Sequence, residues 1–400
     1  MVYLIWLLRV RNGKEVQVIM RILHTALRYP PATGGAERYI QEIVERTRDI
    51  DEGRDVRVLT SRMRTNGPIT LLDPKLLQDN PIYVQRLSSA KTPLVSYPRL
   101  QALSYYIGHH KPDILEGYGF WYQPADTAAR YAKKHNIPFI FHPIYYENAV
   151  RRKPVWKIYQ QTIGRSTFKA ADVVIVLSEF EQELIKQSGM PVQRFEIVPP
   201  GIQMESFKTT RGTPFTGRGI QGTILLAVSR ISKSKGLQDI IQALPDIIRE
   251  VPDAQLVIIG DDFGYASLLK KRAEALGITP HIHFLGKLSE EELIAAYQHA
   301  DIFIHASHYE AFGIVLGEAM AAGTPVVARN STAIPYVVPN NKAGLLFTTH
   351  DDLVQSVVTL CKDTKLAEQF GQYGKKHVQQ NFSWDTSIRN LIAIYEEFRK

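Results

Sequence analysis

Two acidic residues, Glu310 and Glu318, have seven residues between them and stand on either side of an expected helix start. The apolar run Asp301–His305 before them is typical of a short buried strand, after which the chain must turn. A carboxylate in the loop before the helix can accept hydrogen bonds from the hydroxyls of a hexose. A second carboxylate on the first or second turn can accept two from a ribose. The spacing therefore favours a site for a sugar diphosphate.

The start of this helix is the second part of the expected site. Gly313 lets the backbone approach a ligand closely where the helix begins. Four backbone amides are expected to face outward unpaired: Ala311, Phe312, Gly313 and Ile314. Four such N–H groups, together with the positive end of the helix dipole, favour a phosphate or a sugar hydroxyl. Gly323 can close the helix in the left-handed conformation.

The run from Glu310 to Ala328, with Ala-Met-Ala-Ala-Gly-Thr-Pro-Val-Val-Ala after the second glutamate, resembles the signature of retaining glycosyltransferases with the GT-B fold, family 4 (glycosyltransferase group 1). The resemblance covers nearly all the chain from Met20. It implies an α/β protein of two doubly wound parallel-sheet (Rossmann-like) domains facing across a cleft. The alternative is that Glu318 is a solvated helix residue and Glu310 an ordinary first-turn charge.

Two cations follow the apolar strand Thr223–Arg230 in the second half of the chain. Arg230 and Lys235 stand at the carboxyl end of this strand, where two fixed cations can neutralise a diphosphate as it becomes the leaving group. The segment Ser229–Gly236 resembles the family's Gly-Arg followed by Lys-Gly, with a serine in place of the common glycine. Solvated loop charges are the alternative interpretation.

Three further positions take a role from the resemblance. Gly34 and Gly35, at an expected strand-to-helix turn, resemble the loop that lies across the cleft from the phosphates, although a flexible turn is the alternative. His142 ends an apolar strand, where open α/β sheets bind ligands, and the resemblance assigns it to the sugar pocket rather than to a structural role. The backbone near Lys287 and Leu288 is expected to meet the nucleotide base.

The resemblance also implies the chemistry, which is transfer of a hexosyl unit from a UDP- or GDP-sugar to a hydroxyl of a glycan, glycolipid or small-molecule acceptor. The predicted catalytic residues are His142, Glu310, Arg230 and Lys235. Glu310 would hold sugar hydroxyls while the leaving phosphate assists front-face attack, so the anomeric configuration is retained. No cluster has metal-ligand spacing on a single element, which favours a metal-independent transfer with no cofactor besides the nucleotide sugar.

Length and composition fit two domains. The 400 residues are 44% apolar, enough for two buried cores. The segment 209–222, rich in Gly, Thr and Pro, is the best linker. We therefore expect an acceptor-side domain over 1–204, a nucleotide-sugar-binding domain over 205–382, and a helix at 383–400 that packs back on the first. Strands and helices alternate, as in doubly wound sheets, with strands at 55–61, 81–85, 113–117, 139–142 and 172–178 and helices at 125–136 and 237–250.

Charge and cysteine content limit the partners and the compartment. The formal charge of +8 favours anionic partners, but no nucleic-acid-binding motif is present. The segment Arg151–Lys169 contains no acid and interleaves Trp156, Tyr159 and Phe168, so it is a candidate for peripheral contact with an anionic membrane or for acceptor binding. An ordinary solvated helix face with its aromatics in the core is the alternative. The single Cys361 indicates a reducing cytoplasm, which places any membrane contact at the inner face.

The first nineteen residues precede the first expected strand of the sheet. Met1–Leu8 is apolar but too short to span a bilayer, and three cations follow it without a small-residue cleavage site. We interpret 1–19 as an extension or a misplaced start. The alternative is an additional edge strand at Val2–Leu8.

Two rival functions stay open. A GT-B-fold nucleotide-sugar epimerase shares the two-lobed architecture, and a non-catalytic sugar-binding protein would share the cleft. The epimerase should lack the run from Glu310 to Pro325, and the binding protein should carry a secretion signal. An NAD oxidoreductase needs Gly-x-Gly-x-x-Gly after a strand, which the sequence lacks at the expected place.

Overall fold

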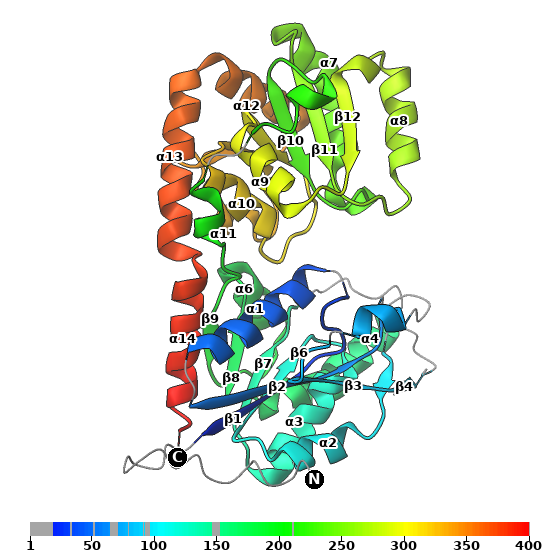
Figure 1. The fold of residues 1–400 in the computed structure, drawn as a ribbon, viewed down its shortest axis with the longest axis vertical. Helices are drawn as coiled ribbons and strands as arrows, with labels where there is room; N and C mark the ends of the chain where they lie inside the picture. The colour runs from blue at the N-terminus through cyan, green and yellow to red at the C-terminus, as the bar shows by residue number, and fades with distance from the viewer. Residues whose placement is uncertain are drawn as a thin grey trace. The chain divides into compact units, whose positions relative to one another are not determined.

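The structure is a computed structural model, and its described residues form two compact units, each with its own sheet (Figure 1). The described residues are 19–32, 34–50, 53–64, 71–78, 80–90, 92, 97–145, 153–209 and 212–399. The first unit takes residues up to Ile175 with Gln187–Glu196 and Leu391–Lys400, and the second takes Val176–Lys186 and Ile197–Asn390. Residues 1–18 of the extension expected at 1–19, with the alternative edge strand at Val2–Leu8, lie outside the described residues, as do the cations Arg151 and Arg152.

A seven-stranded sheet carries the first unit, in the order β3-β2-β1-β6-β7-β8-β9. Its strands are β1 Met20–Thr25, β2 Arg54–Ser61, β3 Val84–Leu87, β6 Ile114–Tyr118, β7 Phe139–His142, β8 Val173–Val176 and β9 Phe195–Ile197. The pairings from β3 to β8 are parallel. Strands covered on both faces read as continuous apolar runs, and β7, Phe-Ile-Phe-His, is buried at every position.

The helices of this part of the chain alternate with those strands. They are α1 Gly35–Ile50, α2 Leu103–His110, α3 Gln123–His135, α4 Lys153–Tyr159, α5 Arg165–Ala170 and α6 Glu179–Gln187, and nearly all of α6 belongs to the second unit. The last helix, α14 Trp384–Glu396, follows α13 in the chain and is divided between the two units at Leu391. A π-helical turn over Gln160–Gly164 joins α4 to α5, and the short strands β4 Ser89–Ala90 and β5 Arg99–Leu100 form an antiparallel pair.

The second unit has a six-stranded, all-parallel sheet in the order β12-β11-β10-β13-β14-β15. Its strands are β10 Ile224–Val228, β11 Gln255–Ile259, β12 Ile282–Gly286, β13 Ile302–His305, β14 Val326–Arg329 and β15 Gly344–Phe347. The chain order reverses between β10 and β13, and the carboxyl ends at such a reversal are where open α/β sheets bind ligands.

The helices of the second unit cover both faces of its sheet (Figure 1). They are α7 Leu237–Glu250, α8 Ala266–Ala275, α9 Glu290–Gln298, α10 Ile314–Ala322, α11 Ile334–Val337, α12 His350–Lys362 and α13 Thr364–Asn381. Side chains of α7, α8 and α12 form one apolar cluster with alternate residues of the strands. The contacting helices α9 and α10 lie outside this cluster.

The predicted α/β class with two parallel sheets is confirmed, as are both ends of the helix at 237–250. The strand predicted at 81–85 is instead β3 Val84–Leu87, because the preceding residues form a turn in which Ile82 is 98% exposed. The functional roles expected for domains 1–204 and 205–382 stay predictions. Among the described residues no helix is both long enough and apolar enough to cross a membrane.

Candidate active site

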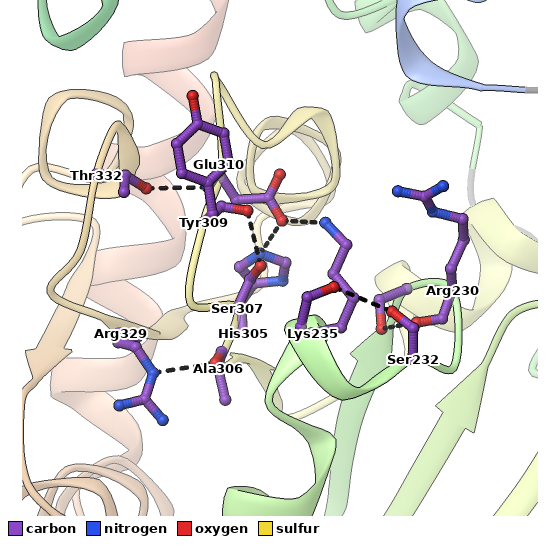
Figure 2. Close-up of polar contacts among 12 residues, drawn as sticks. Arg230, Ser232, Lys235, His305, Ala306, Ser307, Tyr309, Glu310, Arg329 and Thr332 are labelled. Atoms are coloured by element: carbon purple, nitrogen blue, oxygen red, sulfur yellow. Dashed lines mark hydrogen bonds and ion pairs between the residues drawn. The ribbon is translucent and has the colours of Figure 1, made fainter. Parts of the chain in front are cut away.

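The loop that carries Glu310 joins β13 to α10 and is fixed by hydrogen bonds from the loop after β14. The Glu310 amide donates to Thr332 Oγ1 at 2.9 Å, and the Arg329 Nε donates to the Ala306 carbonyl at 3.0 Å (Figure 2). Ser331 Oγ donates to the Ser307 carbonyl at 3.1 Å. Because the backbone is held at three points, the Glu310 carboxylate leaves the loop from a defined position.

The carboxylate of Glu310 lies between two N–H donors. Its Oε1 accepts hydrogen bonds from Lys235 Nζ at 2.5 Å and from His305 Nε2 at 3.0 Å (Figure 2). Burial alone would raise the pKa of Glu310, but the neighbouring His305 and Lys235 outweigh it and lower the pKa to about 2. The carboxylate is therefore ionised at neutral pH.

The position of Lys235 follows from a close approach of two loops. Lys235 ends a short 3-10 turn, and Gly236 follows it with a φ of 70°. A Cβ at Gly236 would lie 1.9 Å from the Ala306 carbonyl oxygen, so only glycine fits. The His308 amide also donates to the Ser234 carbonyl at 3.0 Å. These contacts hold the loops after β10 and β13 together at the reversal of the sheet.

Arg230 is the exposed cation of the same loop. Its Cζ lies 5.3 Å from the ring centroid of Phe263, which is itself 60% exposed. Two main-chain hydrogen bonds join the loops after β10 and β11: Ile231 N–H donates to Asp261, and Phe263 N–H donates to Ile231. In Figure 2 the guanidinium makes no contact with the other residues drawn, so its N–H groups can bind an anion.

The first turns of α10 combine the expected amides with a buried carboxylate. Gly313 precedes the helix with a φ of 89°, and none of the amides from 311 to 314 donates a hydrogen bond within the described part of the chain. Glu318 is only 9% exposed, and its Oε2 accepts from the Tyr297 hydroxyl at 2.9 Å. Glu318 is therefore not a solvated helix residue. Gly323 ends α10 with a φ of 85°, as predicted.

Lys287 and Leu288 lie directly after β12, two strands from β10 in the sheet. This two-residue loop is fixed at both ends. Before it, the Gly286 carbonyl accepts a hydrogen bond from the Gly260 amide at 2.8 Å, and after it Ser289 is the N-cap of α9. The loop is thus placed at the same carboxyl edge as Arg230. Its expected contact with a base stays a prediction.

In the first unit, His142 is fully buried at the end of β7. Its Nε2 lies 2.8 Å from Glu116 Oε2, and its Nδ1 has no hydrogen-bond partner among the described residues. Glu116 also accepts from the hydroxyls of Tyr118 and Tyr395, and its Oε2 lies 3.4 Å from His24 Nδ1. Burial raises the pKa of Glu116, but the two histidines outweigh it and hold the pKa well below its usual value. Burial lowers the pKa of His142 and favours its neutral form.

The two glycines before α1 have different surroundings. A Cβ at Gly34 would lie 2.1 Å from Glu37 Oε2, and Glu37 is a buried carboxylate that pairs with Arg28. Gly35 begins α1 with open space where a side chain would stand. Gly34 thus has a local packing role, and the ligand contact of both glycines stays a prediction.

The basic segment after residue 152 divides by burial. Trp156, Tyr159 and Phe168 are core residues, exposed by 6, 6 and 0%. The alternative interpretation is thus correct for the aromatics, since none of the three is free to meet a membrane. Lys157 is exposed beside Ile158, which is 65% exposed.

The structure brings Lys235 and Glu310 into contact and places Arg230 on the loop that carries Lys235. His142, Gly34 and Gly35 belong to the first unit, and every other predicted site residue belongs to the second. The sequence analysis did not assign to the site four residues that contact its carboxylates and histidine: His305, Tyr297, Glu116 and Tyr118. It also missed Tyr395, which donates to Glu116. A signal existed for two of them, because His305 and Glu116 are polar residues in otherwise apolar strands. The described residues contain no group of three or more potential metal ligands.

Family models match both halves of the chain. The model described as "Glycosyl transferases group 1" matches residues 217–377, and the model described as "Glycosyl transferase 4-like domain" matches residues 34–201. Together they span most of the chain, and each falls mainly on one of the two sheets.

Characterised relatives match over part of their length. The chain is 34% identical over 242 residues to a D-inositol 3-phosphate glycosyltransferase of Corynebacterium jeikeium, covering 57% of this chain and 58% of the relative. It is 32% identical over 252 residues to a GDP-mannose-dependent alpha-(1-6)-phosphatidylinositol monomannoside mannosyltransferase of Mycobacterium tuberculosis. That match covers 60% of this chain and 64% of the relative. The match thus spans less than two thirds of either relative.

Solved structures match over almost the whole chain. A glycosyltransferase from Rickettsia africae has a TM-score of 0.76 at 21% identity, covering 95% of this chain and 98% of that one. Anabaena HepE in complex with UDP has a TM-score of 0.75 at 21% identity, covering 94 and 100%. These structures share the two-domain GT-B fold with this chain. The two family models, which match residues 34–201 and 217–377, show that the chain belongs to the glycosyl transferases group 1 family.

Proposed function

We propose that the protein transfers a hexosyl unit from a UDP- or GDP-sugar to a hydroxyl of a glycan, a glycolipid or a small-molecule acceptor, with retention and without a metal. The observation that carries this proposal is the Glu310 carboxylate held by Lys235 at the carboxyl ends of β10 and β13, with the exposed Arg230 on the Lys235 loop. Cations beside ionised carboxylates suit a ligand that is anionic at one end and rich in hydroxyls at the other.

The proposed binding mode uses three parts of the second unit. Arg230, Lys235 and the free amides at the start of α10 bind the diphosphate, and Glu318 binds the ribose. The loop at Lys287 and Leu288 meets the base. These two cations would stabilise the leaving diphosphate without a metal. The one Asp-x-Asp sequence of the chain, at residues 49–51, begins in the last turn of α1 and is far along the chain from these loops, and its second aspartate lies outside the described residues.

A substrate screen tests the proposed function. Hydrolysis and transfer are measured with UDP-, GDP- and ADP-sugars against lipid and soluble acceptors, with and without EDTA. We expect a glycosylated acceptor and free UDP or GDP, at a rate that EDTA leaves unchanged. An epimerised nucleotide sugar would identify an epimerase instead, and binding without turnover of any donor would identify a binding protein.

Replacing Glu318 with alanine should weaken binding of the free nucleotide diphosphate. The lost carboxylate would remove hydrogen bonds to the ribose, each worth roughly 1.5–3 kcal/mol, so the Kd should rise at least tenfold. Isothermal titration calorimetry with UDP and GDP measures this change. Tyr297→Phe is a control for the fold around Glu318, because it removes only the hydroxyl that contacts the carboxylate. An unchanged Kd for Glu318→Ala would rule out the ribose role.

Replacing Arg230 or Lys235 with alanine should reduce the affinity for diphosphates more than for a nucleoside. Each cation would lose a charge-assisted contact of roughly 1.5–3 kcal/mol. Calorimetry with UDP and uridine, or GDP and guanosine, separates the two contributions. Lys233→Ala, in the same 3-10 turn, is the matched control. Equal losses for nucleoside and diphosphate would contradict the assignment.

We further propose that the acceptor side works at the inner face of an anionic membrane. The exposed Lys157 and Ile158 support this, because a cation beside an exposed apolar side chain suits a lipid surface. Sedimentation with vesicles of phosphatidylglycerol and phosphatidylcholine should show binding that falls with salt and with Lys157→Glu. Equal binding to neutral vesicles would remove this part of the proposal.

A further inference from the structure

His305 has no role in the proposed binding mode, yet it contacts the central carboxylate of the site. It is the last residue of β13, after three apolar residues, and it is only 3% exposed. Its ring stacks on Phe303 two residues earlier in the strand, with the two planes 17° apart. A histidine in this position has its side chain fixed by the sheet, so it can hold a neighbour in place.

Both N–H donors to Glu310 use the same oxygen. Lys235 and His305 donate to Oε1, and Oε2 accepts no hydrogen bond from any described residue. The carboxylate is therefore tethered on one side and open on the other. An ionised carboxylate has lone pairs for several hydrogen bonds, so Oε2 can accept from a ligand hydroxyl.

The two tethers differ in what a bound nucleotide sugar does to them. Lys235 is a flexible four-carbon chain, and the diphosphate that it would bind competes with Glu310 for its ammonium group. The imidazole of His305 is short, buried and fixed on a strand. When Lys235 turns to the diphosphate, His305 is the contact to Oε1 that stays.

We propose that His305 is a positioning residue, which holds the Glu310 carboxylate by Oε1 so that Oε2 accepts a hydrogen bond from a hydroxyl of the bound sugar. The inference rests on the proposed function, because it takes from it the contact of Glu310 with the sugar. A ring with a proton on Nε2 is sufficient, and no change in its charge is required. His305 thereby contributes to recognition of the sugar without touching it.

Three variants separate this role from a general effect on folding. His305→Phe keeps a flat ring and removes the N–H donor, whereas His305→Gln offers an amide N–H at a similar reach. Glu310→Gln serves as the partner in a double-mutant cycle. His283→Phe is the matched control, since His283 is a strand histidine of the same sheet that bonds Gln255 instead. Thermal unfolding of each variant checks that the fold is intact.

Two quantities are measured for each variant. The first is the ratio of the affinities for UDP and UDP-glucose, and for GDP and GDP-mannose. The second is the turnover of whichever nucleotide sugar is a donor. His305→Phe should keep the nucleotide diphosphate Kd within about twofold and lose about tenfold in turnover, the scale of one hydrogen bond to a charged group. His305→Gln should recover most of that loss. When Glu310→Gln is already present, adding His305→Phe should lower turnover further by less than about twofold.

Four results would overturn the inference. Normal turnover of His305→Phe beside an impaired Glu310→Gln would remove the role of His305 and leave the proposed function standing. Independent, additive losses would show that His305 does not act through Glu310, and an equal loss of UDP and UDP-glucose affinity would show a general distortion of the loop. If His305→Phe does not fold, His305→Gln provides the test. A folded His305→Gln whose turnover stays far below that of the parent protein would overturn the inference. A fully active Glu310→Gln instead removes the proposed role of Glu310.

Discussion

Replacing Glu116 with glutamine should lower the free energy of unfolding of the first unit by about 3–5 kcal/mol, the usual cost of breaking a buried ionic contact. Glu116 is fully buried and accepts hydrogen bonds from His142, Tyr118 and Tyr395. Its Oε2 also lies 3.4 Å from His24 Nδ1. In glutamine, an NH2 group would replace one of the two carboxylate oxygens, so it would face hydrogen-bond donors instead of accepting from them. The substitution would also remove the negative charge beside the two histidines.

Hydrogen–deuterium exchange of the full chain measures this effect where it occurs. Peptides covering β1, β6 and β7 should exchange faster by about two to more than three orders of magnitude, because core amides report the free energy of opening. Glu42→Gln is the matched control, since its carboxylate lies on α1 in a partly exposed pair with Arg46 and should change stability by less than about 1 kcal/mol. Protection of β6 equal to that of the parent protein would refute the role of Glu116.

The same network gives a pH dependence with a definite sign. The folded-state pKa of Glu116 lies below its ordinary value of 4.5, so its stabilisation is present above that pH and is lost as the pH falls. The pKa of His142 also lies below its ordinary value of 6.5, so the unfolded chain takes up a proton that the folded chain excludes. Protection of the first unit should therefore decline below about pH 6.5 through His142, and decline further below about pH 4.5 through Glu116. In Glu116→Gln, the part of the decline below pH 4.5 that comes from Glu116 should disappear.

Local patterns predicted the frame of the candidate site. The strand before Glu310, the glycines at both ends of α10 and the helix after Gly236 all follow from short-range rules on apolar runs and left-handed residues. The position of Glu310 within hydrogen-bond reach of Lys235 could be expected as well, because both follow strands that are neighbours at the reversal of a parallel sheet.

The contacts that set the chemistry of these residues could not be predicted in the same way. Tyr395 reaches Glu116 across 279 residues of sequence, and Tyr297 reaches Glu318 from a different helix. Hydrophobic periodicity cannot predict such a contact, because it describes only the helix or strand to which each residue belongs. Burial is equally invisible: His142 ends an apolar strand as expected, yet both of its ring nitrogens are enclosed, one against Glu116.

The tethering of Glu310 bears on how the sugar is transferred. A retaining double displacement needs a carboxylate that attacks the anomeric carbon. Glu310 is a weak candidate for this role, because its pKa is lowered to about 2 and one oxygen already accepts two hydrogen bonds. A carboxylate of such low basicity is better suited to holding hydroxyls. This favours front-face attack assisted by the leaving phosphate, with Arg230 and Lys235 stabilising the diphosphate.

Replacing Glu310 with glutamine should therefore reduce kcat by about 10- to 100-fold, while the Kd of the free nucleotide diphosphate changes by less than about threefold, because the contact that we propose for Glu310 is with the sugar. Glu291→Gln, an exposed acid on α9, is the control for the loss of one charge in the same unit. NMR of the freshly formed glycoside should show the anomeric configuration of the nucleotide sugar. An inverted anomer would overturn front-face transfer, and a sugar ester trapped on Glu310 by mass spectrometry would replace it with double displacement. Retention without such an ester, together with a loss confined to kcat, is the result expected of a carboxylate that orients the sugar while the phosphate departs.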